Sequence, residues 1–225
     1  MVVIIDYGMG NLRSVSKALE SLGAAVRVSS DPQDVERASK LILPGVGAFG
    51  AAMEELKRRN LVEPIKAAIA SDKPYLGICL GLQLLFEHSE EGDVDGLGVL
   101  RGSVRRFSFD SGRRTQDAGL KVPHMGWNEV QRPRPADQQS RGGQATSDKR
   151  QGSCPLLNGI PDQSYFYFVH SYYGVLQERS VVALETDYGI RFTSMVWRNN
   201  VFATQFHPEK SQAVGLKLLK NFIDL

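Results

Sequence analysis

Cysteine, tryptophan and histidine are scarce in this chain of 225 residues, which contains two, two and four of them. Two cysteines, Cys79 and Cys154, are too few for a disulfide framework, so we expect a reduced, cytoplasmic setting. No apolar run approaches the roughly 18 residues of a membrane-spanning helix, so we expect no membrane span. The first residues, Met1–Asp6, also lack the basic start of a secretion signal.

An excess of charge of one sign is missing as well. The chain has 27 Lys and Arg against 25 Asp and Glu, which does not favour a nucleic-acid-binding surface. The small positive excess comes from one polar stretch, residues 131–153, which carries five basic and two acidic side chains. Loops of this length are functional or disordered. We therefore expect a single domain over 1–225 with a flexible insertion at 131–153, a partner-binding arm being the alternative reading of that insertion.

Short apolar runs alternate with helical patterns through the first half of the chain. The runs at 2–5, 25–28, 41–43 and 75–78 predict buried strands, with helical spacing between them and again over 80–85. This order is typical of a parallel, doubly wound sheet. The second half has strand-like segments at 99–107, 120–122, 129–130, 165–169, 181–184, 192–197 and 201–206, then a helical pattern over 211–222. We expect an α/β fold with a mostly parallel central sheet and antiparallel additions.

Cys79 lies in the sharpest local motif, Gly77-Ile78-Cys79-Leu80-Gly81, between an apolar strand and a leucine-rich helix. Glycines on both sides of a nucleophile allow a strained strand-to-helix elbow that lifts its side chain clear of the sheet. A thiol at a helix N-terminus is favoured as thiolate. The alternative is a buried structural cysteine, because free cysteine is among the most buried residue types.

His207 and Glu209 supply the base and the orienting group that a thiolate nucleophile needs. His207 follows the apolar run 201–206, so it is expected at the edge of the sheet where α/β proteins bind ligands. In an extended segment Glu209 would project to the same side and hold the imidazole in one tautomer, as in a catalytic triad. The alternative for a lone His-x-Glu is a surface ion pair.

A glycine-rich turn, Leu43–Gly47, follows the strand at 41–43. Its amides near Val46 and Gly47, with the amide of Leu80, are candidate oxyanion donors, although the turn alone would suit any tight bend. No cofactor is predicted, because the early Gly8-Met9-Gly10 turn lacks a third glycine and no phosphate-binding Lys motif follows. No Cys/His spacing indicates a metal, and His88 is interpreted as a solvated helix end.

Together these motifs resemble those of the class I, or triad, glutamine amidotransferases, over nearly the whole chain except 131–153. The resemblance implies a three-layer, flavodoxin-like α/β fold. It implies that Cys79 attacks the side-chain amide of L-glutamine, while His207, oriented by Glu209, protonates the leaving ammonia and then activates water. Three further residues resemble the positions that hold glutamine, and these are Gln83, Ser171 and Tyr172.

Four stretches, 6–11, 44–49, 123–128 and 205–211, are similar to the glutaminase subunits of imidazole glycerol phosphate synthases, enzymes of histidine biosynthesis. The run His124-Met125-Gly126-Trp127-Asn128 discriminates best, because the triad motifs are shared by the whole superfamily. This resemblance implies a heterodimer with a (β/α)8-barrel cyclase, which uses the ammonia to make imidazole glycerol phosphate and an aminoimidazole carboxamide ribotide. The residues implied at or near that interface are Asn11, Trp127, Asn128 and Lys210.

Two alternatives stay open at this point. The chain could feed another synthase, of the anthranilate, purine or vitamin B6 type, because the triad motifs do not distinguish between them. It could also be a catalytically silent assembly subunit, although such a relative should have lost at least one of Cys79, His207 and Glu209, and all three are present.

Overall fold

The computed structural model describes residues 1–109, 120–133 and 153–225. Its largest sheet has seven strands, in the order β11 (Val182–Tyr188), β12 (Ile190–Arg198), β13 (Val201–Thr204), β4 (Tyr75–Cys79), β3 (Lys40–Gly45), β1 (Val2–Ile5) and β2 (Val26–Ser29). The strands from β13 to β2 run parallel, and β12 and β11 extend the sheet antiparallel beyond β13. This arrangement confirms the predicted sheet.

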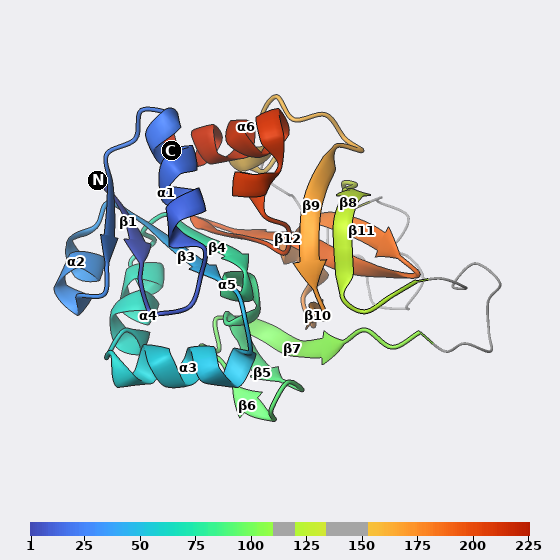
Figure 1. Cartoon of the computed structure of the whole chain (residues 1–225), viewed down its shortest axis with the longest axis horizontal. Helices are drawn as coiled ribbons and strands as arrows, with labels where there is room; N and C mark the ends of the chain where they lie inside the picture. Colours follow the sequence, from blue (N-terminus) through green and yellow to red (C-terminus); the bar gives the residue numbers. More distant parts are fainter. Residues whose placement is uncertain (110–119, 134–152) are drawn as a thin grey trace.

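Helices cover both faces of this sheet, as the alternation of buried side chains requires (Figure 1). Along β1, Val3 and Ile5 pack in one apolar cluster with α2 (Pro32–Arg37), α3 (Phe49–Arg58) and α4 (Val62–Ala70). Val2 and Ile4 face the opposite side and pack with α1 (Leu12–Ser21) and α6 (Gln212–Ile223). Successive strand side chains point to opposite faces, so β1 is buried on both sides. The three-layer architecture is thus confirmed.

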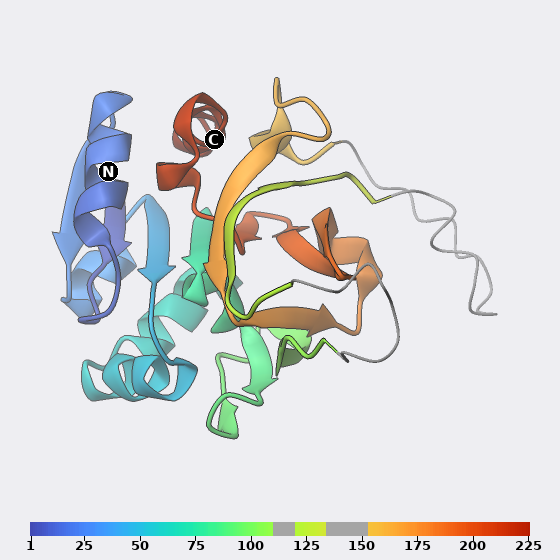
Figure 2. The same ribbon diagram turned by 45° about the vertical axis from the view of Figure 1, so that its right-hand side comes forward.

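Two smaller sheets were not predicted. One has the order β10 (Tyr172–Leu176), β7 (Leu100–Arg106), β5 (Phe86–Ser89), β6 (Val94–Asp95). The other is a two-stranded ribbon of β8 (His124–Glu129) and β9 (Tyr165–His170), which curves past the end of the central sheet (Figure 2). The ribbon is the element that carries the most discriminating sequence motif.

Three expectations about local structure were wrong. The helix expected over 80–85 ends early, as α5 (Leu80–Gln83), because the carbonyls of Leu84 and Leu85 accept hydrogen bonds from the amides of Leu97 and Leu100, both at 2.8 Å. The chain then enters β5, so His88 is a strand residue beside Asp93 and Asp95 rather than a helix end. Residues 120–122 form no strand, and pairing starts at His124.

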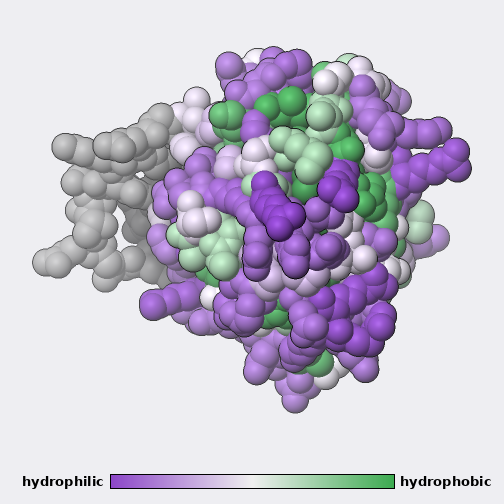
Figure 3. Space-filling model, turned by 90° about the vertical axis from the view of Figure 1, so that its left-hand side faces the viewer, coloured by the Kyte–Doolittle hydropathy of each residue, from purple (hydrophilic) through white to green (hydrophobic). Residues whose placement is uncertain are grey.

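The polar stretch at 131–153 lies outside the described residues from 134 to 152. Its first two residues contact the rest of the chain: Gln131 pairs with Glu185, and the Arg132 amide donates to Asp162 at 2.8 Å. On the side of the molecule formed by β2 and α2, the surface is mostly hydrophilic (Figure 3). In the described part of the chain, no helix combines the length and apolar character needed to cross a membrane.

Packing of α6 onto the sheet provides a test of this architecture. Phe222 is fully buried and meets Phe202 of β13 edge-on, with ring centroids 6.4 Å apart. We expect Phe222→Ala to lower the free energy of unfolding by about 3–5 kcal/mol, because it leaves a cavity in the layer that supports β13. Urea denaturation measures the change. Leu225→Ala, at an exposed position in the same terminal segment, serves as control and should change stability by less than about 1 kcal/mol.

Candidate active site

Cys79 is the last residue of β4 and directly precedes α5, and its backbone is strained, with φ 54° and ψ −104°. Positive φ at a non-glycine residue costs of order 1–3 kcal/mol. The flanking glycines permit this sharp turn because neighbouring backbone atoms lie where a side chain would be. A Cβ on Gly81 would lie 1.9 Å from the Leu43 carbonyl oxygen, and one on Gly77 would lie 2.6 Å from the Gly81 carbonyl oxygen. The predicted strand-to-helix elbow is therefore present.

His207 reaches the same sheet edge because β13 lies parallel to β4, with Thr204 opposite Ile78. Its Nδ1 lies 2.8 Å from Glu209 Oε1, and both side chains are buried. His207 itself is extended, with φ −101° and ψ 95°, but the expectation that the extended segment continues to Glu209 was wrong. Residues Pro208–Lys210 form a 3-10 turn, closed by a bond from the Lys210 amide to the His207 carbonyl at 3.0 Å. This turn, rather than strand alternation, brings the carboxylate to the imidazole.

The charge state of His207 follows from its neighbours. Burial lowers its pKa, but the charge on Cys79, a hydrogen-bonding contact with that sulfur and the Glu209 carboxylate outweigh burial and raise the pKa to about 10. Nδ1–H donates to Glu209, and Nε2 is buried without another partner. The imidazole thus interacts with both Cys79 and Glu209, which is the arrangement predicted for the acid–base group of a triad.

A cavity of about 320 Å³ opens beside Cys79, within the size range of small-molecule sites. It brings together all the residues predicted for the oxyanion and for glutamine, namely Val46, Gly47, Leu80, Gln83, Ser171 and Tyr172. A larger hollow of about 530 Å³, lined by Arg132, Cys154 and Trp197 among others, contains none of them. Because Cys79, the predicted nucleophile, lines the smaller cavity, that cavity is the candidate active site. The described residues hold no cluster of three or more metal-binding side chains.

Glu91 also lines this cavity, and sequence reasoning missed it. Its Oε2 accepts a hydrogen bond from the Phe49 amide at 2.9 Å, at the start of α3. The preceding residue, Ala48, has no side chain that could cap that helix, so the carboxylate takes this position. In the sequence, Glu90-Glu91 is indistinguishable from a solvated acidic pair, and only the turn after β5 carries Glu91 into the cavity.

Two buried histidines, for which the sequence motifs gave no structural role, pair with each other at this site: His170 lines the cavity, and His124 contacts His170. His170 Nδ1 is 2.7 Å from the Tyr172 carbonyl oxygen, and His170 Nε2 is 3.0 Å from His124 Nδ1. Asn128 Nδ2 lies 3.2 Å from His124 Nε2. Burial lowers the pKa of His170 to about 3 and that of His124 to about 4, so both rings are neutral at pH 7. They fix the backbone of the cavity wall without adding charge.

The residues expected at a partner interface lie around the same edge of the central sheet as Cys79 and His207. Trp127 is 46% exposed on the outer face of the β8–β9 ribbon, and Lys210 Nζ lies 5.7 Å from the ring centre of Tyr167 on the same face. Asn128 turns to the inner face, toward His124 and the Asp187 carbonyl. Asn11 is exposed and caps α1, which contacts the Pro208–Lys210 turn.

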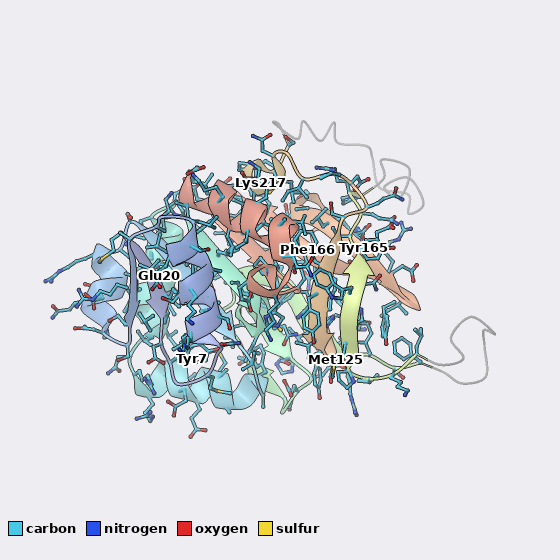
Figure 4. All side chains as sticks on the ribbon, turned by 45° about the horizontal axis from the view of Figure 1, so that its top comes forward. Tyr7, Glu20, Met125, Tyr165, Phe166 and Lys217 are labelled. Carbon is cyan, nitrogen blue, oxygen red and sulfur yellow. The ribbon has the colours of Figure 1, made fainter. Side chains whose placement is uncertain are left out.

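The outer face of the ribbon is unusually apolar for an exposed surface. Besides Trp127, it exposes Met125 by 62% and Tyr165 by 55%, at opposite ends of the ribbon (Figure 4). Phe166, next to Tyr165 in the chain, is fully buried on the inner face. Large exposed aromatic and Met side chains gathered on one face are typical of a protein-binding surface.

Comparisons with known proteins show the family of this chain. The family model described as "Glutamine amidotransferase class-I" matches residues 3–225. A protein from Syntrophotalea carbinolica is 51% identical over 100% of both chains, and one from Aromatoleum aromaticum is 52% identical over 99% of this chain and 97% of its own. Both carry the name "Imidazole glycerol phosphate synthase subunit HisH".

Solved structures share the fold at low identity. A structure titled "Structure of PurLQS from Thermotoga maritima" has a TM-score of 0.70 at 18% identity, covering 99% of this chain and 97% of that one. Another, titled "Crystal structure of glutamine amidotransferase", has a TM-score of 0.69 at 17% identity with 99% and 97% coverage. At this identity the likeness concerns the fold alone.

The coupling between Cys79 and His207 gives a direct test of the site. We expect the His207 imidazole to stay protonated up to about pH 10, and Cys79→Ala to lower its pKa, because the substitution removes the sulfur that raises it. NMR titration of the ring Cε1–H signal measures both values. The control, Cys154→Ala, removes the other buried thiol and should leave the titration unchanged. An identical His207 titration with and without Cys79 would contradict the assignment.

Proposed function

Because this chain belongs to the class-I glutamine amidotransferases, we propose that it is the glutaminase subunit of an imidazole glycerol phosphate synthase and that Cys79, His207 and Glu209 are its catalytic triad. Relatives of that name share 51% and 52% of their residues with this chain over almost its full length, which supports the subunit assignment. The single observation that carries the chemistry is the buried His207, which is hydrogen-bonded to Glu209 and interacts with Cys79, the residue that lines a small cavity.

The first half of the reaction forms a thioester. The Cys79 thiolate attacks the side-chain amide carbon of L-glutamine, and the carbonyl oxygen becomes an oxyanion held by the amides of Val46 or Gly47 and of Leu80. His207, protonated on Nε2, gives that proton to the amide nitrogen, and ammonia leaves as the tetrahedral intermediate collapses. A pKa of about 10 keeps the proton on His207 until the leaving nitrogen needs it.

The second half releases glutamate. The now neutral Nε2 of His207 takes a proton from water, and the resulting hydroxide attacks the thioester carbon. The carbon–sulfur bond breaks, glutamate leaves, and the thiolate–imidazolium pair is restored. Throughout, Glu209 accepts from Nδ1–H at 2.8 Å, which keeps Nε2 directed to the reacting atoms.

The cavity also holds the other end of the substrate. The α-ammonium group of glutamine requires negative charge, and Glu91 is the carboxylate that lines the cavity. The amide nitrogen of Gln83 donates hydrogen bonds to the Tyr172 carbonyl oxygen, at 3.0 Å, and to Gln205 Oε1, at 3.1 Å. Gln83 Oε1 is thereby left for the substrate's N–H groups. Ser171 and Tyr172 also line the cavity.

Ammonia released into water becomes ammonium, which is not a nucleophile, so the product must pass to a docked synthase. The partner that fits the proposed subunit is a (β/α)8-barrel cyclase, which would convert the ammonia into imidazole glycerol phosphate and an aminoimidazole carboxamide ribotide. Its docking surface on this chain is the outer face of the β8–β9 ribbon with Trp127, Met125 and Tyr165, continued by Lys210 and Asn11. Asn128 acts from the inner face, where it holds His124.

Loss of the nucleophile provides the primary test. We expect Cys79→Ala to abolish glutamine hydrolysis and Glu209→Gln to lower kcat roughly 10²–10⁴-fold, because the amide cannot stabilise the imidazolium. Glutamate release is measured with the barrel subunit and its phosphoribosyl substrate present, and circular dichroism checks the fold. Cys154→Ala should retain full activity. Wild-type turnover in Cys79→Ala would end the proposal.

The docking surface is tested separately. Trp127→Ala should weaken binding of the barrel subunit about 10–100-fold in calorimetric titration, because large aromatic side chains at interface centres dominate binding energy. Val28→Ala removes another exposed apolar side chain, on the edge strand β2, and should leave the affinity unchanged. Equal affinity of the Trp127→Ala and wild-type proteins would remove the ribbon from the interface.

A further inference from the structure

Gln205 is a fully buried polar side chain for which the triad mechanism has no use. It directly follows β13 and stands two positions before His207. Its Nε2 lies 3.6 Å from Cys79 Sγ, and its Oε1 lies 3.1 Å from Gln83 Nε2. The side chain therefore connects the nucleophile with a residue of the glutamine cavity.

The orientation of both amides follows from one carbonyl group. The Tyr172 carbonyl oxygen can only accept, so the side-chain end of Gln83 that lies 3.0 Å away must be its NH₂. The same NH₂ meets Gln205, which must present its oxygen there, and the nitrogen of Gln205 is then directed at the sulfur. His170 donates to the same Tyr172 oxygen at 2.7 Å and helps to hold it in place.

We propose that Gln205 is a catalytic residue whose side-chain N–H donates to Cys79 Sγ and stabilises the thiolate, its polarity fixed through Gln83 by the Tyr172 carbonyl. The inference rests on the proposed glutaminase function and assigns a further residue to the same site. Gln205 carries no charge, so it favours the thiolate without drawing the proton away from His207.

One contact of the sulfur works against the thiolate, and such a donor offsets it. The Val169 carbonyl oxygen lies 3.8 Å from Cys79 Sγ, and because it can only accept, it favours the protonated thiol. Gln205 opposes this effect because it presents a hydrogen-bond donor to the sulfur. Negative charge leaves the sulfur when the carbon–sulfur bond forms and returns when that bond breaks. The same N–H therefore stabilises both the attacking thiolate and the departing one.

Gln205 has a second contact that allows its two roles to be separated. Through its Oε1 it holds Gln83, which turns Gln83 Oε1 toward the substrate. Gln205→Met removes both the donor to sulfur and the acceptor for Gln83. Gln205→Glu keeps an acceptor for Gln83 but replaces the N–H by a carboxylate oxygen. We expect the first variant to raise KM and lower kcat, and the second to lower kcat with a smaller effect on KM.

Alkylation of Cys79 by iodoacetamide between pH 6 and 9.5 tests the proposal without glutamine. The full chain carries Cys154→Ala, so that Cys79 is the single thiol. We expect both Gln205 variants to react about tenfold more slowly at pH 7, with the pH of half-maximal rate moved upward, because a hydrogen bond to a charged group is lost. Thr204→Val is the matched control: it removes a buried hydroxyl that donates to the Phe206 carbonyl and does not touch the sulfur.

Thermal unfolding identifies any variant that does not fold, and only Gln205 variants that melt cooperatively are compared. If Gln205→Met does not fold, the isosteric Gln205→Glu variant carries the test. A folded variant that alkylates like the parent across the pH range would overturn the role of Gln205. That result differs from failure of the proposed function, which would show as absence of glutamate release by the wild-type protein with its barrel partner.

Discussion

The parallel pairing of β4 with β3 on one side and β13 on the other is the constraint on which the site depends. It places the ends of three strands side by side, so the turn after β3, the elbow after β4 and the segment after β13 meet at one edge. Cys79, His207 and the Val46–Gly47 turn come from distant parts of the chain. The sheet alone brings them together, and the helices on both faces hold the sheet in place.

Much of this arrangement could be predicted from local sequence. Continuous apolar runs identified the parallel strands, and the glycines around Cys79 identified the elbow, because both signals reflect the geometry of a few adjacent residues. His207 and Glu209 were found in the same way. The reason for their contact was nevertheless wrong, since a 3-10 turn beginning at Pro208 brings them together rather than an extended strand.

Residues whose roles depend on distant contacts could not be found in this way. Glu91 enters the cavity only because β5 replaces the end of a helix, and that change follows from hydrogen bonds to residues Leu97 and Leu100. His124 and His170 are partners across two strands, and nothing in their spacing indicates it. Gln205 acquires a defined orientation through Gln83 and a backbone carbonyl, which no local pattern encodes.

The strained backbone at Cys79 has a consequence for the evolution of such a chain. A glycine there would adopt φ 54° and ψ −104° at far lower energetic cost, so the backbone at this position favours glycine over the proposed nucleophile. Substitution by glycine at this position would therefore relieve the backbone strain while removing the thiol. Selection for the proposed reaction opposes that substitution, and a lineage that no longer needed the ammonia would be expected to lose the cysteine early.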